Sequence, residues 1–203
     1  IIPFKIAGIS KKNTPRTIVG TGINLLDRVN YFTLINTSAS FTYRWKETQT
    51  KGWEVTPAFV NDIRLPYISP AFSERLAQNS FLRNTYKQTF IEGENVTFTF
   101  SNKEKKFGKN YSYLKLGAEE AGGLVSGIIA ATGNKNTDFA QYVKFDFDAQ
   151  HFFTLQHSTF AFRFYGGVGL PYGESTTLPY IKQYFLGGAY SIRGWRIRQL
   201  GPG

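Results

Sequence analysis

Hydrophobic and polar residues alternate one by one in several stretches of the chain. From 159 to 170 the even positions are almost all apolar, whereas the odd positions carry Thr, Ala, Arg, Tyr and Gly. Successive side chains of a β-strand point to opposite faces, so this stretch predicts a strand with one apolar and one polar face. A helix would instead spread the phenylalanines of this stretch around its circumference.

The same alternation recurs along the chain and predicts about eight strands, each near the ~9–11 residues of a tilted transmembrane strand. Besides 159–170, clear examples lie within 39–46, 53–63, 96–101, 114–119 and 143–148, and weaker ones within 2–9 and 17–26. The chain is therefore expected to be all-β and antiparallel.

A soluble β-sandwich and a transmembrane β-barrel both fit such a pattern. Full charges such as Arg44, Lys115 and Arg163 stand in the middle of the polar faces, which suits a water-filled interior. Several apolar faces end in Tyr or Trp, as in the aromatic belts of membrane interfaces. The pattern therefore favours the barrel.

Connections of two kinds alternate between the predicted strands, as they do between the two sides of an outer-membrane barrel. Short turns are expected near 10–16, 48–52, 101–109 and 150–157, and longer segments at 66–87, 122–138 and after 171. The short connection at 27–30 is an exception, because it falls among the long ones.

One helix is expected within the long connection 66–87. Ser69 fits an N-cap, and Pro70 follows at the first helical position. Phe72, Leu76 and Leu82 would then lie on one face of a short helix, together with the tyrosine at position 86.

The charge and composition exclude several classes of protein. The net charge is +10, but the basic residues are spread along the chain without a nucleic-acid-binding motif, so anionic lipid headgroups suit the charge better than nucleic acid. There is no cysteine, and hence neither a disulfide nor a thiolate metal site.

Candidate chemistry is sparse. His151 and His157 fall in or beside an expected turn, without a nucleophile motif. Asp146 and Asp148 share a strand face, where a pair balanced by Lys144 and Arg163 is a simpler interpretation than a cation site. We therefore expect no catalytic residue, no metal ion and no cofactor.

Both ends of the sequence suggest a piece of a longer protein. The chain contains no Met and has no signal-peptide pattern at its start. It stops in turn residues at 199–203 rather than at the end of a strand. Residues 1–170 are expected to supply the strands and 171–203 a long extracellular loop.

The stretch 184–195, followed by Gly-Pro-Gly at 201–203, closely resembles the sixth extracellular loop of the BamA/TamA superfamily. The shared motif is a Gly-Gly pair, a short spacer, and an apolar-Arg-Gly-aromatic sequence. Its residues here are Gly187, Gly188, Ser191, Ile192, Arg193, Gly194 and Trp195. Segments 26–32, 171–173 and 178–180 also resemble the TamL-like branch of bacterial lipoproteins.

The resemblance implies a bacterial outer-membrane barrel of about 16 strands, preceded by POTRA domains. Such proteins are not enzymes: they insert barrel proteins into the outer membrane or translocate polypeptides. Implied partners are lipopolysaccharide and phospholipid, client polypeptides and periplasmic or accessory assembly subunits, with no nucleic acid. By similarity, Arg193 would reach into the lumen and hold the loop, folded inward, against later strands.

Strand parity is consistent with this resemblance. In the family the loop follows the eleventh strand, which runs outward, so the first strand here would be the fourth and would run inward. The POTRA domains, the first three strands and the final strands would then lie outside this sequence.

Three alternatives remain open. The first is a secretion porin that exports one dedicated partner. The second is the barrel of a patatin-like phospholipase fusion, whose catalytic part would lie upstream. The third is a diffusion porin, against which the loop motif argues.

Overall fold

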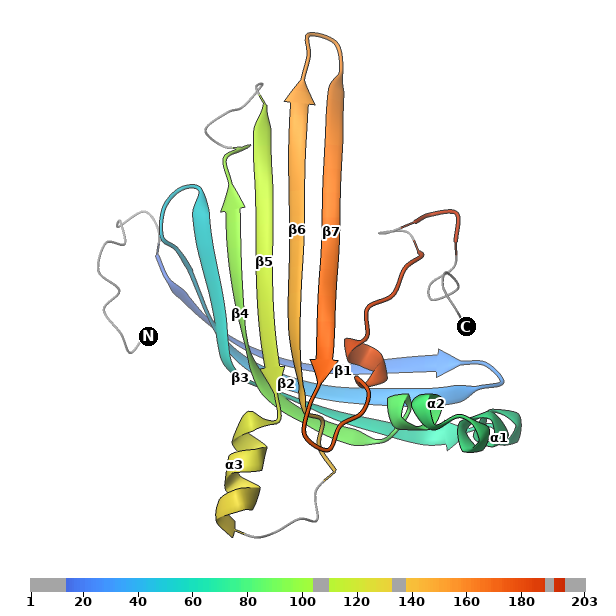
Figure 1. Cartoon of the computed structure of the whole chain (residues 1–203). Coiled ribbons are helices and arrows are strands. Elements are labelled where there is room, and N and C mark those ends of the chain that lie inside the picture. Colours follow the sequence, from blue (N-terminus) through green and yellow to red (C-terminus); the bar gives the residue numbers. More distant parts are fainter. Residues whose placement is uncertain (1–13, 104–109, 133–137, 189–191, 196–203) are drawn as a thin grey trace.

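Seven strands form one antiparallel sheet in which each strand pairs with the next in sequence (Figure 1). The computed structural model describes residues 14–103, 110–132, 138–188 and 192–195, without side chains for 128–132. The strands are β1 (Arg16–Arg28), β2 (Phe32–Lys46), β3 (Lys51–Ile68), β4 (Thr89–Ser101), β5 (Tyr111–Ala121), β6 (Tyr142–Thr154) and β7 (Thr159–Pro171). Seven of the expected strands are thus confirmed, and the one predicted at 2–9 lies outside the described residues.

The sheet has one apolar and one polar face, as the alternation predicts. Residues paired across neighbouring antiparallel strands share a face. One row of the apolar face runs through Trp53, Phe98, Leu116, Phe147 and Gly166. A row of the polar face runs through Thr99, Lys115, Asp148 and Tyr165.

The strands are longer than the alternation alone suggests, with 11 residues in β5 and 18 in β3. All of them except β5 therefore extend past the ~9–11 residues that cross a membrane. Over the described strands the sheet does not close on itself. This all-β architecture is that of a barrel fragment, in agreement with the sequence.

A β-bulge in β3 turns one aromatic side chain onto the polar face. The register with β4 shifts between Thr56 and Phe59, and Pro57, which has no N–H to donate, lies within the shift. Because of the extra residue, Phe59 pairs with Ser40 and becomes buried on the polar face.

Two short helices cover one end of the polar face (Figure 1). These are α1 (Pro70–Gln78) and α2 (Ser80–Thr85). The predicted cap is confirmed, because Ser69 Oγ accepts a hydrogen bond from the N–H of Phe72. The single expected helix is instead two, since Asn79 ends α1 and its side chain caps α2 through the N–H of Leu82.

The buried core lies between these helices and the sheet. Phe32 is completely buried, and its ring centroid lies 5.5 Å from that of Phe72, 5.0 Å from that of Tyr86 and 5.9 Å from that of Tyr180. Rings at these separations contribute favourable contacts beyond the burial of their area. An aromatic cluster therefore joins β2, the helices and the chain that follows β7.

The connections differ from the sequence analysis in one unpredicted helix and in one turn that was placed wrongly. The segment 122–138 contains a helix, α3 (Gly123–Thr132), that the sequence did not predict. The turn expected at 150–157 is shorter, because β6 continues to Thr154. His151 is consequently a strand residue, with its Nδ1 2.9 Å from Ser112 Oγ. None of the described helices has the length and apolar character needed to cross a membrane.

Phe32→Ala is expected to lower the free energy of unfolding by about 3–5 kcal/mol, because it leaves a cavity at the centre of the aromatic cluster. Denaturant unfolding of the full-length protein in detergent measures the change. Phe81→Ala is the matched control, since the Phe81 side chain is 56% exposed and should contribute little. Equal stability of the two variants would contradict the placement of the core.

Candidate functional site

The chain that follows β7 turns back over the polar face of the sheet (Figure 1). It includes a short 3₁₀ helix, η2 (Tyr180–Lys182). Residues 172–188, here called the loop arm, contact β5, β6 and β7 as well as α2. The candidate site is this contact between the loop arm and the sheet.

An ion pair joins the loop arm to β5. Lys182 Nζ lies 2.8 Å from Glu119 Oε1, and the same carboxylate oxygen accepts a hydrogen bond of 2.8 Å from the hydroxyl of Tyr142. The ammonium group also lies 4.4 Å from the ring centroid of Phe59. The two charged side chains are only 16% and 18% exposed. Charges withdrawn from water need their partners, so this pair fixes the arm at one place on the sheet.

Two glycines of β7 make room for the loop arm. A Cβ atom at Gly167 would lie 2.5 Å from Cζ of Tyr184, and a Cβ at Gly169 would lie 2.5 Å from Cδ2 of Leu178. Both glycines belong to the polar face by their register with β6. A larger residue at either position would displace the loop side chain, so these glycines form a recess for the arm.

Tyr184 adds a polar contact in this recess. Its hydroxyl donates a hydrogen bond of 3.1 Å to the carbonyl oxygen of Phe145. Lys144 Nζ lies 4.4 Å from its ring centroid, a cation–π distance. Burial, with a smaller contribution from Asp146, raises the pKa of Tyr184 to about 12. The hydroxyl therefore stays protonated at neutral pH and remains a donor.

The start of the loop arm is held by Gln141, which is buried beside β6. Its backbone N–H donates to Ser175 Oγ, and its side-chain oxygen accepts from the N–H of Glu174, both at 2.9 Å. Its carbonyl oxygen accepts from the N–H of Tyr172 at 3.1 Å. Its side-chain nitrogen donates to Ser126 Oγ of α3 at 2.9 Å. One side chain thus links the arm to the unpredicted helix.

Further contacts connect the arm to α2. The Gln183 side-chain nitrogen donates hydrogen bonds of 3.0 Å to Thr85 Oγ1 and to the carbonyl oxygen of Leu178. Tyr180 packs on Tyr86 with ring centroids 4.8 Å apart. The arm therefore rests on the sheet along one side and on the helical cap along the other.

The predicted loop motif begins where the arm ends. Gly187 and Gly188 have φ angles of 98° and 89°, a region that favours glycine. The N–H of Gly188 donates to the carbonyl oxygen of Trp195 at 2.8 Å, which brings the two ends of the motif together. The N–H of Trp195 also donates to the carbonyl oxygen of Ile192 at 3.1 Å, so a turn encloses Arg193 and Gly194.

The proposed inward role of the motif arginine is not tested by these contacts. Ile192, Arg193, Gly194 and Trp195 are all exposed, and Ser191 lies outside the described residues. Later strands, which the resemblance implies as partners of Arg193, are not part of this sequence. The lumen-holding role of the motif therefore stays a prediction.

Elsewhere on the polar face the charges form pairs. Arg163 makes two hydrogen bonds to Asp148, with Nε 3.0 Å from Oδ1 and Nη2 2.7 Å from Oδ2. This confirms the predicted balance between these two residues. Arg44 also pairs with Glu54 across β2 and β3, through one contact between Nε and Oε2. Among the described residues no group of three or more histidine or acidic side chains is arranged to hold a metal ion.

The sequence singled out the motif but not the residues that seat the loop arm. Lys182 and Glu119 are 63 positions apart, and no local pattern relates them. In the sequence, Gly167 and Gly169 look like ordinary strand glycines. Only their contact with the loop arm shows why a side chain is absent there. The one available signal was their position on the polar face, where a strand gains nothing from lacking a side chain unless another segment approaches closely.

A two-faced antiparallel sheet with a loop seated on its polar face is the architecture of an outer-membrane β-barrel fragment. A family model described as the Omp85 superfamily domain matches residues 12–203, and the chain belongs to this superfamily. The match confirms the superfamily that the loop motif indicates. No curated protein and no solved structure matches the chain.

Membership supplies a general function and location. The superfamily is typical of the outer membrane, where its members insert or translocate proteins. Its members interact with client proteins and accessory subunits. The assignment to the TamL-like branch stays a prediction.

Replacing either member of the ion pair is expected to loosen the loop arm. Lys182→Met or Glu119→Gln should cost about 1.5–3 kcal/mol, the usual value of a hydrogen bond to a charged group. If the arm opens rapidly, a loss of about 2 kcal/mol raises protease cleavage within 172–188 roughly 30-fold. The double variant should cost less than the sum of the two single variants.

Lys87→Met is the matched control for this prediction. Lys87 Nζ lies 2.8 Å from Asp138 Oδ1, but the two side chains are 52% and 70% exposed. Such an exposed pair contributes little to stability. Cleavage rates that change equally in Lys182→Met and Lys87→Met, or in neither, would show that the Lys182–Glu119 pair does not hold the arm.

Proposed function

We propose that the full-length protein is a BamA/TamA-like factor that inserts barrel proteins into the outer membrane or translocates polypeptides across it. In this proposal the apolar face meets lipid, the polar face lines the lumen, and the loop arm folds inward. The observation that supports it is the seated loop arm, with the Lys182–Glu119 ion pair and the glycine recess. The loop motif at 187–195 argues further against a diffusion porin.

The described strands serve as a rigid wall in this mechanism. Six consecutive hairpin pairings, from β1–β2 to β6–β7, hold the wall together. A client strand would be templated by β-augmentation at a weakly paired seam, which the resemblance places between the first and last strands of the barrel. The wall and the loop arm would keep the barrel in shape while that seam opens.

The proposal includes no enzymatic step. The described Ser–His contact, between Ser112 Oγ and His151 Nδ1 at 2.9 Å, lies in paired strands on the apolar side of the sheet. No described acidic side chain hydrogen-bonds to this imidazole, so nothing orients it as a general base. Client polypeptides, accessory subunits and outer-membrane lipid are the proposed partners.

Depletion of the full-length protein is expected to lower the amounts of other barrel proteins in the outer membrane. Quantitative proteomics of purified outer membranes, at several times after depletion, measures the effect. Normal amounts of all other barrels would contradict a general assembly role and leave the export of a dedicated partner. The full-length sequence provides a second test, because a patatin-like domain upstream would favour the phospholipase fusion.

Complementation with variants tests whether the seated loop matters for the function. Lys182→Met and Arg193→Ala should restore barrel amounts only partly, since each removes a cation that the proposal uses to hold the loop. Lys182→Arg should restore them fully, because it keeps the charge and reaches the same carboxylate. Lys87→Met serves again as the control. Full complementation by Lys182→Met and Arg193→Ala would show that the loop need not be held.

A further inference from the structure

A trough on the polar face lies at the end of the sheet where a short turn joins β2 to β3. It encloses about 350 Å³, and its lining includes residues 49 and 50 of that turn. The same row of paired residues that reaches Asp148 on β6 crosses it, so the members of this row belong to the polar face. From β2 to β5 they are Lys46, Gly52, Thr99 and Lys115.

The trough has a low floor between higher walls. Gly52 has no side chain, and Thr97 and Thr99 have short ones, so β3 and β4 form the floor. The walls are the long cationic side chains of the strands on either side, namely Arg44 and Lys46 of β2 and Lys115 of β5. A ligand that lies over β3 and β4 would therefore have cations on both sides.

The polar-face lining of the trough has an excess of positive charge. Glu54 is the one acidic side chain among the lining residues, and it is already paired with Arg44. Asp148 is the register partner of Lys115, but its carboxylate accepts two hydrogen bonds from Arg163. An anionic group placed between the walls would therefore be attracted from both sides.

A second hollow continues the trough along the polar face toward the loop arm. It encloses about 310 Å³, and Glu54 lines both hollows. Lys182 and Glu119, the ion pair of the loop arm, also line it. Most of its other lining side chains are hydroxyls and amides, among them Ser38, Ser40, Thr42, Thr56, Asn61 and Asn95. We call the two hollows together the polar lane.

The polar lane has dimensions that suit an extended polypeptide. On β4 it reaches from Asn95 to Ser101, which is about 20 Å at the rise of an antiparallel strand. An extended segment of about six residues has the same length. Hydroxyl groups and amides can both donate and accept hydrogen bonds, and so can the backbone of such a segment.

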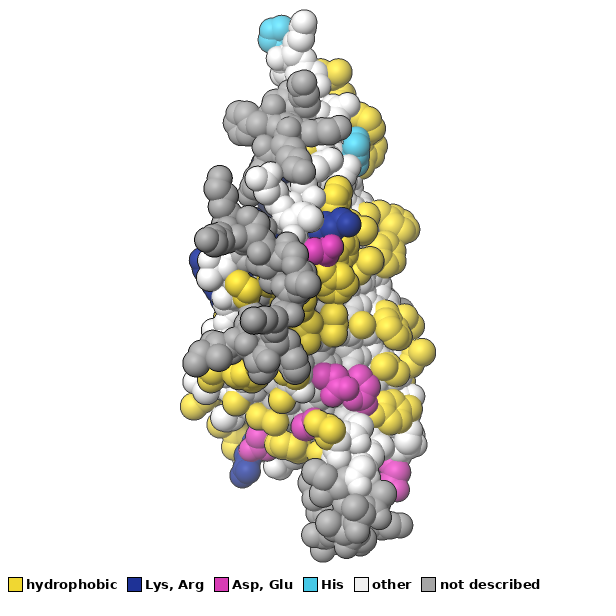
Figure 2. All heavy atoms as spheres, turned by 90° about the vertical axis from the view of Figure 1, so that its left-hand side faces the viewer, with side chains coloured by type: hydrophobic (Ala, Val, Ile, Leu, Met, Phe, Trp, Pro, Cys, Tyr) yellow, Lys and Arg dark blue, Asp and Glu magenta, His cyan; other side chains and the backbone are white. Residues whose placement is uncertain are grey.

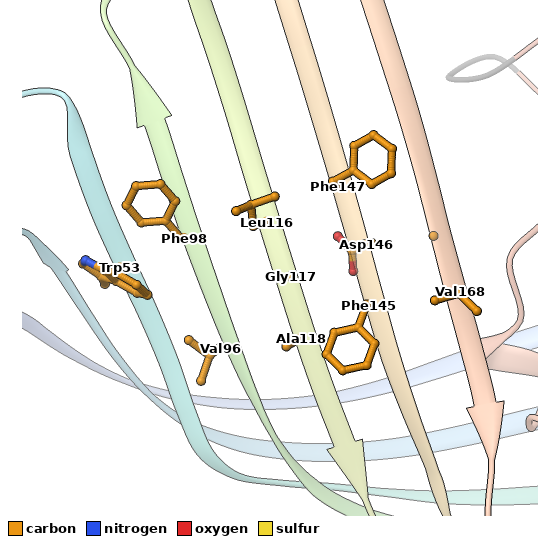
Figure 3. A pocket seen from close by; sticks show the side chains of 11 residues that line it. Trp53, Val96, Phe98, Leu116, Gly117, Ala118, Phe145, Asp146, Phe147 and Val168 are labelled. Atoms are coloured by element: carbon orange, nitrogen blue, oxygen red, sulfur yellow. The ribbon is translucent and has the colours of Figure 1, made fainter.

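The hydrophobic side chains of the same strands lie on the opposite face. Figure 2 shows hydrophobic side chains gathered in a band along one side of the molecule. Phe98, Leu116 and Phe147 stand beside one another on that face (Figure 3). An acyl chain in the polar lane would leave its hydroxyl and amide groups without partners, which argues against a lipid. A small anion would fill only the trough.

We infer that the polar lane binds an extended segment of a client polypeptide, with an acidic side chain in the trough between Lys46 and Lys115. The trough supplies the charge, and the hydroxyl and amide groups supply partners for the backbone. In an outer-membrane barrel the short turns face the periplasm, so the segment would enter the lane at its cationic end. The inference rests on the proposed function, because it takes the occupant to be a client.

Binding of a labelled peptide to the full-length protein in detergent tests the charge part of this inference. The probe is a fluorescent peptide in which aspartate and serine alternate, and the reference peptide has asparagine in place of aspartate. The wild type is expected to prefer the acidic peptide. Lys46→Gln/Lys115→Gln should weaken its binding roughly 2- to 30-fold, the effect of losing two exposed charge pairs, and should leave binding of the asparagine peptide unchanged.

Two single variants serve as controls. Glu54→Gln should strengthen binding of the acidic peptide, because it removes the carboxylate that competes for Arg44. Lys87→Gln removes one cation whose partner is Asp138, outside the polar lane, and should change nothing. Equal binding of the two peptides by the wild type would overturn the inference, and so would unchanged binding by the double lysine variant. Displacement of the peptide by an equal concentration of inorganic phosphate would overturn it as well.

The length of the peptide tests the hydrogen-bonding part without any substitution in the protein. For peptides with a single aspartate, affinity should rise with length up to about six residues and then level off. Affinity that does not depend on length would show that only the carboxylate is bound, and it would overturn the polypeptide occupant.

This experiment and the depletion experiment have separable outcomes. Selective binding of the acidic peptide, with normal amounts of other barrels after depletion, would support the binding site and contradict the assembly function. Lowered amounts of other barrels without selective binding would contradict the binding site alone.

Discussion

The ion pair between Lys182 and Glu119 joins the two parts of the molecule, the sheet and the chain that returns over it. A charged pair with little exposure is costly unless each member keeps its partner, so the loop arm has one favourable position on the polar face. The recess at Gly167 and Gly169 then accepts Tyr184 and Leu178. Ion pair and recess act together, because both lie between the arm and the polar face.

The position of the arm depends in turn on the two-residue alternation of the strands. In an antiparallel sheet of fixed register, alternation collects most apolar side chains on one face and most charged side chains on the other. The side chains of the polar face need hydrogen-bond or ion-pair partners, and one end of this face needs a covering layer. The helices α1 and α2 close that end with an aromatic core around Phe32. The apolar side chains are left on the opposite face, which in a membrane barrel meets the lipid.

Much of the fold could be predicted from the sequence, because its signals are local. Alternation located the strands from β1 to β7 and their faces, except beyond the bulge in β3, where Phe59 lies on the polar face instead of beside Trp53. The Ser69-Pro70 pair located the start of α1. The helix α3 was missed because its first turn holds no acidic residue and its apolar residues lack a clear periodicity. The partners of the loop arm were missed for another reason: Lys182 and Glu119 meet only after the strands have paired. The motif around Arg193 located the loop in the sequence but did not show which residues of the sheet the loop arm contacts.

Chemical cross-linking between positions 144 and 184 tests most directly whether the loop arm is seated on the sheet, because Lys144 of β6 lies against the Tyr184 ring and both replacements leave the Lys182–Glu119 ion pair intact. Residues 1–203 contain no cysteine, so Lys144→Cys/Tyr184→Cys introduces the only two thiols in this part of the protein. A short bis-methanethiosulfonate reagent, applied to outer membranes that contain the full-length protein, should link the two positions and change the mobility of the protein on a denaturing gel. Lys144→Cys/Lys87→Cys should not be linked under the same conditions. Failure of the 144–184 pair to link, with both thiols shown to be reactive, would contradict the seated loop.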